Sequence, residues 1–182
     1  AGTTNIITFS SCVYSLATME LLSDVDLSSV EGFPFVNIPP GVTYVIDGGG
    51  FTLSASKSST LGSLFTVEAG ASLELRNIVL TNEGGRAVYV ESGGTLIAGE
   101  GCVFKGNTGA DYGGAVYNYG GTFNADSATF TNNTASGQYS DGGAVYNGYK
   151  SSCSGGDCEC SGNNPDNIGS DADSCYLGSG CP

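Results

Sequence analysis

Residues 113–118 read Gly-Gly-Ala-Val-Tyr-Asn, and residues 142–147 repeat the same six residues. A weaker copy, Gly-Arg-Ala-Val-Tyr-Val, occupies residues 85–90. Each copy follows a second short element: Val-Leu-Thr-Asn at 79–82, Phe-Lys-Gly-Asn at 104–107 and Phe-Thr-Asn-Asn at 130–133. The Asn residues that end these elements lie 25 and 26 positions apart. A period of this size indicates a solenoid, in which each repeat forms one coil.

The local pattern favours strands over helices. Short segments alternate apolar and polar residues, as in Val-Thr-Tyr-Val-Ile at 42–46, and Gly, Asn and Asp separate them. We predict an all-β fold, a single right-handed parallel β-helix of about six coils with a disulfide-rich C-terminal cap. Its expected parts are an N-terminal strand or cap segment at 1–17, the β-helix at 18–150 and a cysteine-rich segment at 151–182.

Paired Gly-Gly-Ala-[Ile/Leu/Val] and Phe-x-x-Asn elements resemble the polymorphic outer-membrane protein repeats of chlamydiae. The chain is also similar, more widely, to parallel β-helices of the pectate-lyase-like class, over residues 18–150. The stretch 45–53, Val-Ile-Asp-Gly-Gly-Gly-Phe-Thr-Leu, is similar to the first coils of such helices. The resemblance implies the fold. It leaves the function open among adhesins, surface coats and lyases, because one fold hosts many functions.

Each position that recurs in the repeats has a structural explanation. The paired glycines suit corners that need a positive φ or a close backbone approach. The Asn residues at 82, 107 and 133 are predicted to stack as a hydrogen-bonded ladder, and Phe104 and Phe130 as an aromatic column. Residues 160–163, Cys-Ser-Gly-Asn, are a candidate fourth copy. The predicted buried positions are Val67, Leu73, Leu75, Val79, Val88, Leu96, Phe104, Val116, Phe123, Phe130 and Val145.

Composition argues against catalysis. The 182 residues carry a formal net charge of −13, with five Lys plus Arg and no His. Five basic residues cannot form a nucleic-acid-binding face, and no apolar run is long enough to span a membrane. Side chains that could serve a polysaccharide lyase or hydrolase do not recur at the coil period; these are Arg76, Arg86, Lys105, Glu74, Glu91 and Glu100. We therefore predict no enzyme activity and no cofactor, with calcium as the one candidate ion.

The cysteines indicate an oxidising compartment. Five of the seven fall in the last 30 residues, at Cys153, Cys158, Cys160, Cys175 and Cys181. Their C-x4-C-x-C spacing does not match a zinc ribbon, so we favour disulfides over thiolate ligands and expect at least four of the five to be bridged. An odd count leaves at least one thiol free or linked to another chain.

Three other features remain open. The acidic stretch with Asp166, Asp171 and Asp173 is either a calcium site or a solvated loop. Asn132 begins the one N-glycosylation sequon, Asn-Asn-Thr. Residues 13–22 are a candidate helical turn over the first coil, and residues 3–9 a strand that pairs within its own chain or with another.

Together these features predict a non-catalytic extracellular structural or adhesive β-solenoid at the cell surface. Its expected partners are other copies of itself or related surface proteins, and glycans. In the sharper form of this hypothesis, subunits stack end to end as a filament or coat. The alternative is a carbohydrate-binding module, or a polysaccharide-active lyase-like or epimerase-like β-helix. In the binding module, the tyrosines beside the Gly-Gly-Ala turns would contact sugar; these are Tyr112, Tyr119, Tyr139 and Tyr149.

Overall fold

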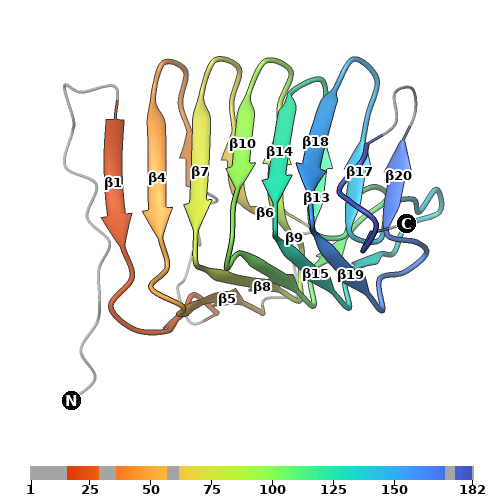
Figure 1. Cartoon of the computed structure of the whole chain (residues 1–182), viewed down its shortest axis with the longest axis horizontal. Coiled ribbons are helices and arrows are strands. Elements are labelled where there is room, and N and C mark those ends of the chain that lie inside the picture. Colours follow the sequence, from red (N-terminus) through yellow and green to blue (C-terminus); the bar gives the residue numbers. More distant parts are fainter. Residues whose placement is uncertain (1–15, 29–35, 57–61, 171–174, 182) are drawn as a thin grey trace.

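A computed structural model describes residues 16–28, 36–56, 62–170 and 175–181, and these form a right-handed parallel β-helix (Figure 1). Three six-stranded sheets run along the solenoid, and every strand pair in them is parallel. The six strands in each sheet agree with the predicted number of coils, and the fold class is confirmed.

Each coil contributes one strand to each sheet. Sheet A contains β1 (Leu16–Glu20), β4 (Thr43–Asp47), β7 (Ser72–Arg76), β10 (Thr95–Ala98), β14 (Thr122–Asp126) and β18 (Ser152–Gly156). Sheet B contains β2 (Val25–Asp26), β5 (Thr52–Ala55), β8 (Val79–Asn82), β11 (Val103–Lys105), β15 (Thr129–Thr131) and β19 (Glu159–Ser161). Sheet C contains β3 (Val36–Ile38), β6 (Ser63–Val67), β9 (Arg86–Val90), β13 (Val116–Asn118), β17 (Val145–Asn147) and β20 (Ile168–Ser170).

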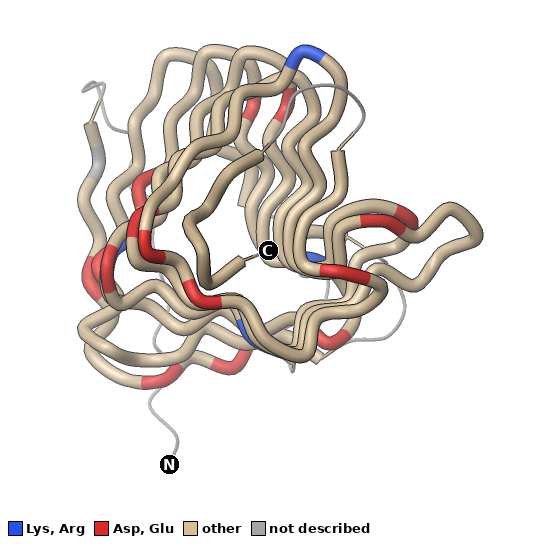
Figure 2. Tube along the Cα trace, turned by 45° about the vertical axis from the view of Figure 1, so that its right-hand side comes forward, with Lys and Arg blue, Asp and Glu red and all other residues tan. Residues whose placement is uncertain are grey.

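A fourth, small sheet joins two longer connections between sheets B and C. It pairs β12 (Thr108–Gly109) with β16 (Thr134–Ala135). Figure 2 shows the coils superimposed, with loops projecting from one corner and acidic positions distributed around the outside. The same view shows few basic positions, because the chain has only five Lys and Arg residues.

The core lies inside the coils and consists of columns of equivalent side chains. In sheet A, Leu73, Leu96 and Phe123 follow one another in register and are fully buried. In sheet C, the buried column contains Phe65, Val88, Val116 and Val145. Each strand places alternate side chains on this inner face, because the side-chain period of a strand is two. The predicted core is therefore confirmed, with one exception.

The exception is Val79, which is only partly buried and faces outward. Strand pairing aligns Leu80, not Val79, with Phe104, and Leu80 is fully buried. The prediction aligned residues 79–82 with 104–107 from the shared Asn. The Leu80–Asn82 segment is one residue shorter than Phe104–Asn107, so that alignment shifted the whole strand by one position and reversed its faces.

Because the Leu80–Asn82 segment is one residue shorter than its counterparts, Asn82 does not join the Asn ladder. Its amide donates instead to the carbonyl oxygens of Gly62 and Arg86, at 3.4 and 2.9 Å. In the longer elements, the additional residue has a left-handed backbone: Gly106, Asn132 and Gly162 have φ of 64°, 54° and 65°. This turn allows the following Asn to point into the coil.

The ladder itself runs through the next three coils. Nδ2 of Asn107 donates to Oδ1 of Asn133 at 2.9 Å, and Nδ2 of Asn133 donates to Oδ1 of Asn163 at 2.9 Å. The backbone N–H groups of Asn107 and Asn133 donate to the same two acceptors. Residues 160–163 are thus the fourth copy of the element, as predicted.

The Gly-Gly-Ala turns match their expected roles. Gly113 and Gly142 have φ of 61° and 62°, the left-handed region that favours glycine. A Cβ on Gly143 would lie 2.4 Å from the backbone nitrogen of Asn164, so the second glycine permits close approach of the next coil. Ala144 follows it and is fully buried.

One expectation at the N-terminal end was wrong. Residues 16–20, which lie within the candidate helical turn at 13–22, form strand β1 and pair with β4 from Leu16↔Thr43 to Glu20↔Asp47. The segment thus extends sheet A by a further strand. Residues 1–15, including the strand-like segment 3–9, lie outside the described part of the chain.

Candidate functional site

A cluster of tyrosines lies on the outer face of sheet C. Tyr89, Tyr117 and Tyr146 occupy paired positions on β9, β13 and β17. They point outward because the preceding Val residues point into the core. The ring centroid of Tyr117 lies 5.3 Å from that of Tyr89 and 5.5 Å from that of Tyr146.

Two further tyrosines join from the connections beside these strands. Tyr112 lies 5.7 Å from Tyr117 and 4.4 Å from Tyr146, and Tyr119 lies 5.9 Å from Tyr117, each measured between ring centroids. We call these five residues the tyrosine cluster: Tyr89, Tyr112, Tyr117, Tyr119 and Tyr146. Tyr146 is 2% exposed and Tyr119 is 52% exposed, so the cluster has a packed base and an open rim. Such a surface combines rigid aromatic faces with hydroxyl groups for hydrogen bonds.

Arg86 lies on β9 with Tyr89 and packs against Tyr117 of the next coil. Its guanidinium carbon lies 5.1 Å from the centroid of the Tyr117 ring, within cation–π range. Burial lowers the pKa of Arg86, and its buried Nε has no hydrogen-bond partner. Burial also raises the pKa of Tyr89 above the ordinary value of 10.0. Arg86 is therefore a cation packed against the rings.

Sequence reasoning identified only part of this cluster. Of the four tyrosines predicted to contact sugar, Tyr112 and Tyr119 belong to it. Tyr139 and Tyr149 are 67% and 64% exposed, and neither ring packs against the cluster; Nζ of Lys150 lies 5.3 Å from the Tyr149 centroid. Tyr89, Tyr117 and Tyr146 were missed, although their place directly after an inward Val was a usable signal.

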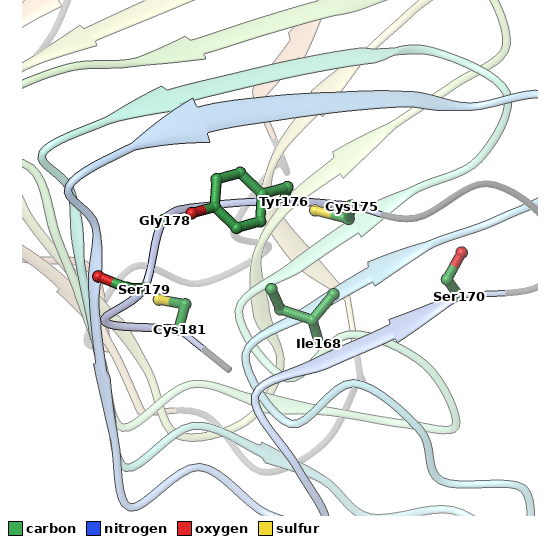
Figure 3. Close-up of a pocket in the computed structure, with 7 residues that line it drawn as sticks. All are labelled: Ile168, Ser170, Cys175, Tyr176, Gly178, Ser179 and Cys181. Atoms are coloured by element: carbon green, nitrogen blue, oxygen red, sulfur yellow. The ribbon is translucent and has the colours of Figure 1, made fainter.

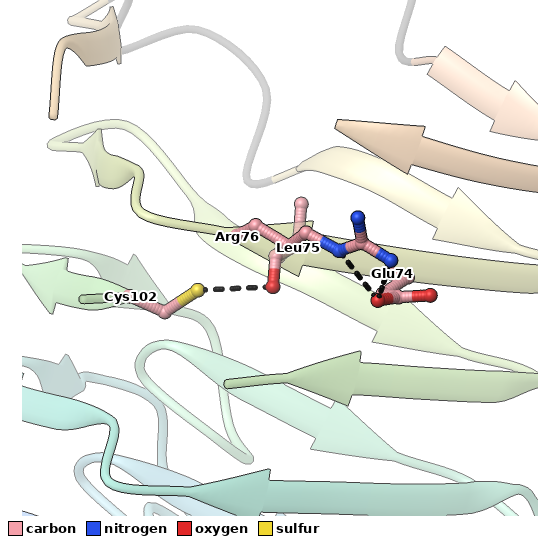
Figure 4. Close-up of polar contacts among 4 residues, drawn as sticks. All are labelled: Glu74, Leu75, Arg76 and Cys102. Carbon is pink, nitrogen blue, oxygen red and sulfur yellow. Dashed lines mark hydrogen bonds and ion pairs between the residues drawn. The ribbon is translucent and has the colours of Figure 1, made fainter. Parts of the chain in front are cut away.

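The charged residues considered for catalysis are distributed over different surfaces. Glu74 and Arg76 lie on the outer face of β7, where Nε of Arg76 donates to Oε1 of Glu74 at 2.6 Å (Figure 4). Arg86 lies on sheet C within the tyrosine cluster, and Lys105 is exposed on sheet B. Glu74 and Arg76 thus form an ion pair with each other. Within the described residues, no ion pair connects either of them to Arg86 or Lys105.

The acidic stretch is only partly described. Oδ1 of Asp166 accepts hydrogen bonds from the backbone N–H groups of Gly142 and Gly143, at 2.9 and 3.3 Å. This carboxylate therefore caps a Gly-Gly-Ala turn. Asp171 and Asp173 lie outside the described residues. Within the described ranges, no group of three or more His, Cys, Asp or Glu side chains is placed to hold a metal ion.

Four of the five C-terminal cysteines are bridged. Cys153 on β18 is linked to Cys175, and Cys160 on β19 to Cys181. The prediction that at least four of the five are bridged is therefore confirmed, and the fifth candidate, Cys158, is a free, buried thiol. Cys158 points inward immediately before β19, two coils from Cys102. Ala128 lies between them, so Cys158 cannot reach that second free thiol.

The thiol of Cys102 is equally enclosed. Its Sγ donates to the carbonyl oxygen of Leu75 at 3.2 Å (Figure 4), and burial raises the pKa of both Cys102 and Cys158. Their column therefore behaves as small apolar core packing. Cys12, the remaining cysteine, lies outside the described residues.

Asn132, the sequon residue, is exposed at the corner that follows β15, whereas its neighbour Asn133 is fully buried. The side chain thus lies where a glycan could extend into solvent, and glycosylation at Asn132 stays a prediction. Among the described residues, no helix has the length and hydropathy to cross a membrane.

Comparison with known proteins supports the repeat assignment. The family model of the Chlamydia polymorphic membrane protein repeat matches residues 101–119 and 127–148. In the structure these residues form two successive coils, with β11 to β13 in the first and β15 to β17 in the second. No curated protein and no solved structure matches the chain. The resemblance predicted from the sequence is thus confirmed: the chain is a parallel β-helix in which two coils match the Chlamydia polymorphic membrane protein repeat.

Proposed function

We propose that this chain is a non-catalytic, extracellular adhesive β-solenoid that binds its partner through the tyrosine cluster on sheet C. The single observation that carries the proposal is the packing of four tyrosines around Tyr117, with Tyr119 half-exposed at the rim. Ordered tyrosines lose little conformational entropy on binding, so a preassembled aromatic surface favours recognition.

The setting of the cluster supports a surface role. The matching repeat is described as a membrane protein repeat, and proteins with such repeats are expected at the cell surface. The two disulfides are typical of an oxidising environment. A rigid solenoid presents a lateral face at a fixed distance from its ends, which suits adhesion.

The charge of the molecule indicates the type of partner. A chain with a net charge of −13 repels acidic glycans and acidic proteins at moderate ionic strength. Sugar rings that carry no charge can stack on tyrosine faces and form hydrogen bonds with the tyrosine hydroxyls. We therefore propose a neutral glycan as the ligand class. The same interaction would serve the carbohydrate-binding alternative, in which binding is the whole function.

The test is binding to a panel of neutral and acidic polysaccharides. Tyr119→Ala should weaken binding to neutral glycans by roughly tenfold or more, because hot-spot aromatic residues dominate such contacts. Tyr139→Ala is the matched control, since Tyr139 is more exposed than Tyr119 but lies outside the cluster. Both variants should keep the circular dichroism spectrum and melting temperature of the wild type. Equal binding by Tyr119→Ala and wild type would overturn the proposal.

A further inference from the structure

A hollow of about 530 Å³ lies at the C-terminal end of the solenoid, between β20 and the tail (Figure 3). Ile168 and Ser170 line it from β20, and Tyr176 and Ser179 line it from the tail. Its described lining contains no charged side chain, and charged groups form the stronger hydrogen bonds with a polar ligand. The tyrosine cluster on sheet C is better equipped for such a ligand, because it contains the guanidinium of Arg86.

The hydrogen-bonding capacity of this guanidinium is not used by the protein. A guanidinium carries five N–H donors and no acceptor. Among the described residues, the guanidinium of Arg86 donates no hydrogen bond and forms no ion pair, and it contacts Tyr117 through the cation–π interaction. Polar groups in protein interiors are normally hydrogen-bonded, so an arginine that keeps all of its donors free requires an explanation.

The accessible donors lie on the outward edge of the guanidinium. Of the three side-chain nitrogens of Arg86, only Nε is both buried and without a partner, so Nη1 and Nη2, which also have no partner, reach solvent. The guanidinium carbon lies 5.1 Å from the centroid of the Tyr117 ring, and this contact holds the planar group in place. The cluster thus presents two parallel N–H groups in a fixed orientation.

Arg86 lies close to the exposed rim of the cluster. Tyr117 contacts both, since the Tyr119 centroid lies 5.9 Å and the Arg86 guanidinium carbon 5.1 Å from the Tyr117 centroid. Burial raises the pKa of Tyr89 most, Glu91 and Tyr119 raise it further, and Arg86 lowers it. The Tyr89 hydroxyl is therefore within electrostatic range of both Tyr119 and Arg86. A ligand that stacks on Tyr119 can reach the free edge of the guanidinium.

We propose that Arg86 determines which sugar the tyrosine cluster binds, by donating from Nη1 and Nη2 to two neighbouring hydroxyl groups of a neutral sugar ring. This inference rests on the proposed function, in which an uncharged glycan is the ligand. Two parallel N–H groups match two oxygen acceptors on adjacent ring carbons, and the Tyr119 ring supplies a face for stacking. Such a site rejects a sugar that lacks either hydroxyl, because its donor is then left unpaired.

The surrounding charges favour a hydroxyl over a carboxylate as the acceptor. Burial lowers the pKa of Arg86 and the nearby Asp111 raises it, while Glu91 acts on the adjacent Tyr89. Within the described residues, neither carboxylate forms an ion pair with Arg86. A carboxylate on the ligand would be repelled by both acidic side chains and by the net charge of −13, whereas an uncharged hydroxyl would not.

The test compares sugars and variants by NMR titration of the full chain. The probes are methyl β-glucoside, methyl β-galactoside and methyl α-mannoside, their monodeoxy analogues, and methyl β-glucuronide as the carboxylate counterpart. Arg86→Met removes all of the donors and keeps an apolar stem, whereas Arg86→Lys keeps the charge but not the parallel pair of N–H groups. Arg76→Met is the matched control, because Arg76 lies on sheet A and is paired with Glu74.

We expect the wild type to bind at least one parent glycoside and to lose roughly tenfold in affinity when either of two neighbouring hydroxyls is removed, as for one hydrogen bond to a charged group. Arg86→Met should bind the parent and these two analogues equally weakly, because a missing hydroxyl has no effect where its donor is absent. Arg86→Lys should discriminate against only one of the two. Arg76→Met should match the wild type, and the glucuronide should bind more weakly than the glucoside.

The experiment separates failure of this inference from failure of the proposed function. If Tyr119→Ala abolishes binding but Arg86→Met keeps the wild-type discrimination against deoxy sugars, only the role of Arg86 is overturned. The same holds if no parent glycoside binds while polysaccharides still bind through Tyr119. Tighter, Arg86-dependent binding of the glucuronide than of the glucoside would assign the site to a carboxylate and overturn the inference. If Arg86→Met does not keep the wild-type circular dichroism spectrum, Arg86→Lys and the wild-type deoxy series decide.

Discussion

The rings of Phe104 and Phe130 stack face to face, with centroids 4.9 Å apart and planes only 5° from parallel. Their strands pair in register at these residues, and the centroid distance equals the spacing of adjacent strands. The stacking of the two rings therefore shows that successive coils superimpose residue by residue. Phe123 of sheet A packs edge-on against Phe130 at 6.4 Å, which joins the aromatic stack to the opposite wall of the core.

Phe130→Ala should destabilise the protein by roughly 3–5 kcal/mol, because the substitution opens a cavity between two coils that cannot collapse independently. Urea denaturation followed by circular dichroism measures the effect. Tyr139→Ala is the control, and its free energy of unfolding should stay within about 0.5 kcal/mol of the wild type because Tyr139 is 67% exposed. Similar losses for both variants would contradict the aromatic stack.

Gly143→Ala should be strongly destabilising, by roughly 3 kcal/mol or more, because its new Cβ would lie 2.4 Å from the backbone nitrogen of Asn164. Backbone on the next coil cannot move aside without breaking the Asp166 cap on this turn. Gly99→Ala is the comparison: no atom lies within 4 Å of that Cβ, and the change should be neutral or slightly stabilising. Thermal melts of the two variants check the contrast, which fails if both behave alike.

Most of the fold was predictable because the repeats can be aligned with one another within the sequence. Inward Val and Phe residues, paired glycines and the Asn at 107 and 133 recur with constant offsets, and each offset corresponds to one place on the coil. The shift at Val79 was not predictable, since both Val79 and Leu80 are apolar and a one-residue deletion leaves the same composition. Strand pairing decides between them, and pairing is a property of neighbouring coils.

The candidate site was predictable only in part. The alternation in Gly-Gly-Ala-Val-Tyr-Asn was sufficient to place Tyr117 and Tyr146 on the outer face, although the prediction did not use it. Their contact with Tyr112 and Tyr119 depends on how the connections fold back over sheet C, which no local pattern encodes. The disulfide pairing likewise depends on where the tail crosses β18 and β19.

Removing either disulfide should lower stability by roughly 3 kcal/mol, the value expected for a closed loop of about 20 residues. The sequence separations are 22 residues for Cys153–Cys175 and 21 for Cys160–Cys181. The double substitutions Cys153→Ser/Cys175→Ser and Cys160→Ser/Cys181→Ser, measured by urea denaturation, test each link separately. Non-reducing peptide mapping of the wild type should recover both pairs. A bridge that contained Cys158 would contradict this connectivity.

Stability should fall as the pH rises above about 9, because burial raises the pKa of Cys102 and Cys158 from the ordinary value of 9.0. Below that pH both folded and unfolded chains hold the thiol protons. Above it the unfolded chain releases them while the folded chain retains them, so unfolding becomes more favourable. Urea midpoints between pH 8 and 10 measure the slope. A Cys102→Ala/Cys158→Ala variant should show a shallower dependence, with the remainder due to groups such as Tyr89.

The same two thiols should resist alkylation in the folded protein. Iodoacetamide reacts with the thiolate, and both groups are buried and protonated at neutral pH. Mass spectrometry should find Cys102 and Cys158 unmodified in native buffer and fully modified in urea. Rapid labelling of Cys158 in native buffer would show that the tail does not cover it.

A second Asn ladder ends at Asn118, and a substitution in the preceding coil should extend it. Nδ2 of Asn118 donates to Oδ1 of Asn147 at 2.8 Å, and both residues are fully buried. Oδ1 of Asn118 has no hydrogen-bond partner, because the paired position in the preceding coil is Val90. An Asn at position 90 would direct its Nδ2 toward that oxygen, by the geometry that each ladder repeats.

Val90→Asn should therefore lower the free energy of unfolding much less than the burial of an amide without a partner. The expected difference is roughly 1–3 kcal/mol, the penalty of an unsatisfied buried polar group. Val88→Asn is the matched control: Val88 is equally buried on the same strand, but its column continues through Val116 and offers no amide partner. Combining Val90→Asn with Asn118→Val should remove the advantage, since the new amide would then face an apolar side chain. Free energies of unfolding for the wild type, Val90→Asn, Asn118→Val and the double variant complete the cycle and give the coupling directly. Equal destabilisation by Val90→Asn and Val88→Asn would show that the free oxygen of Asn118 cannot accept from the coil below.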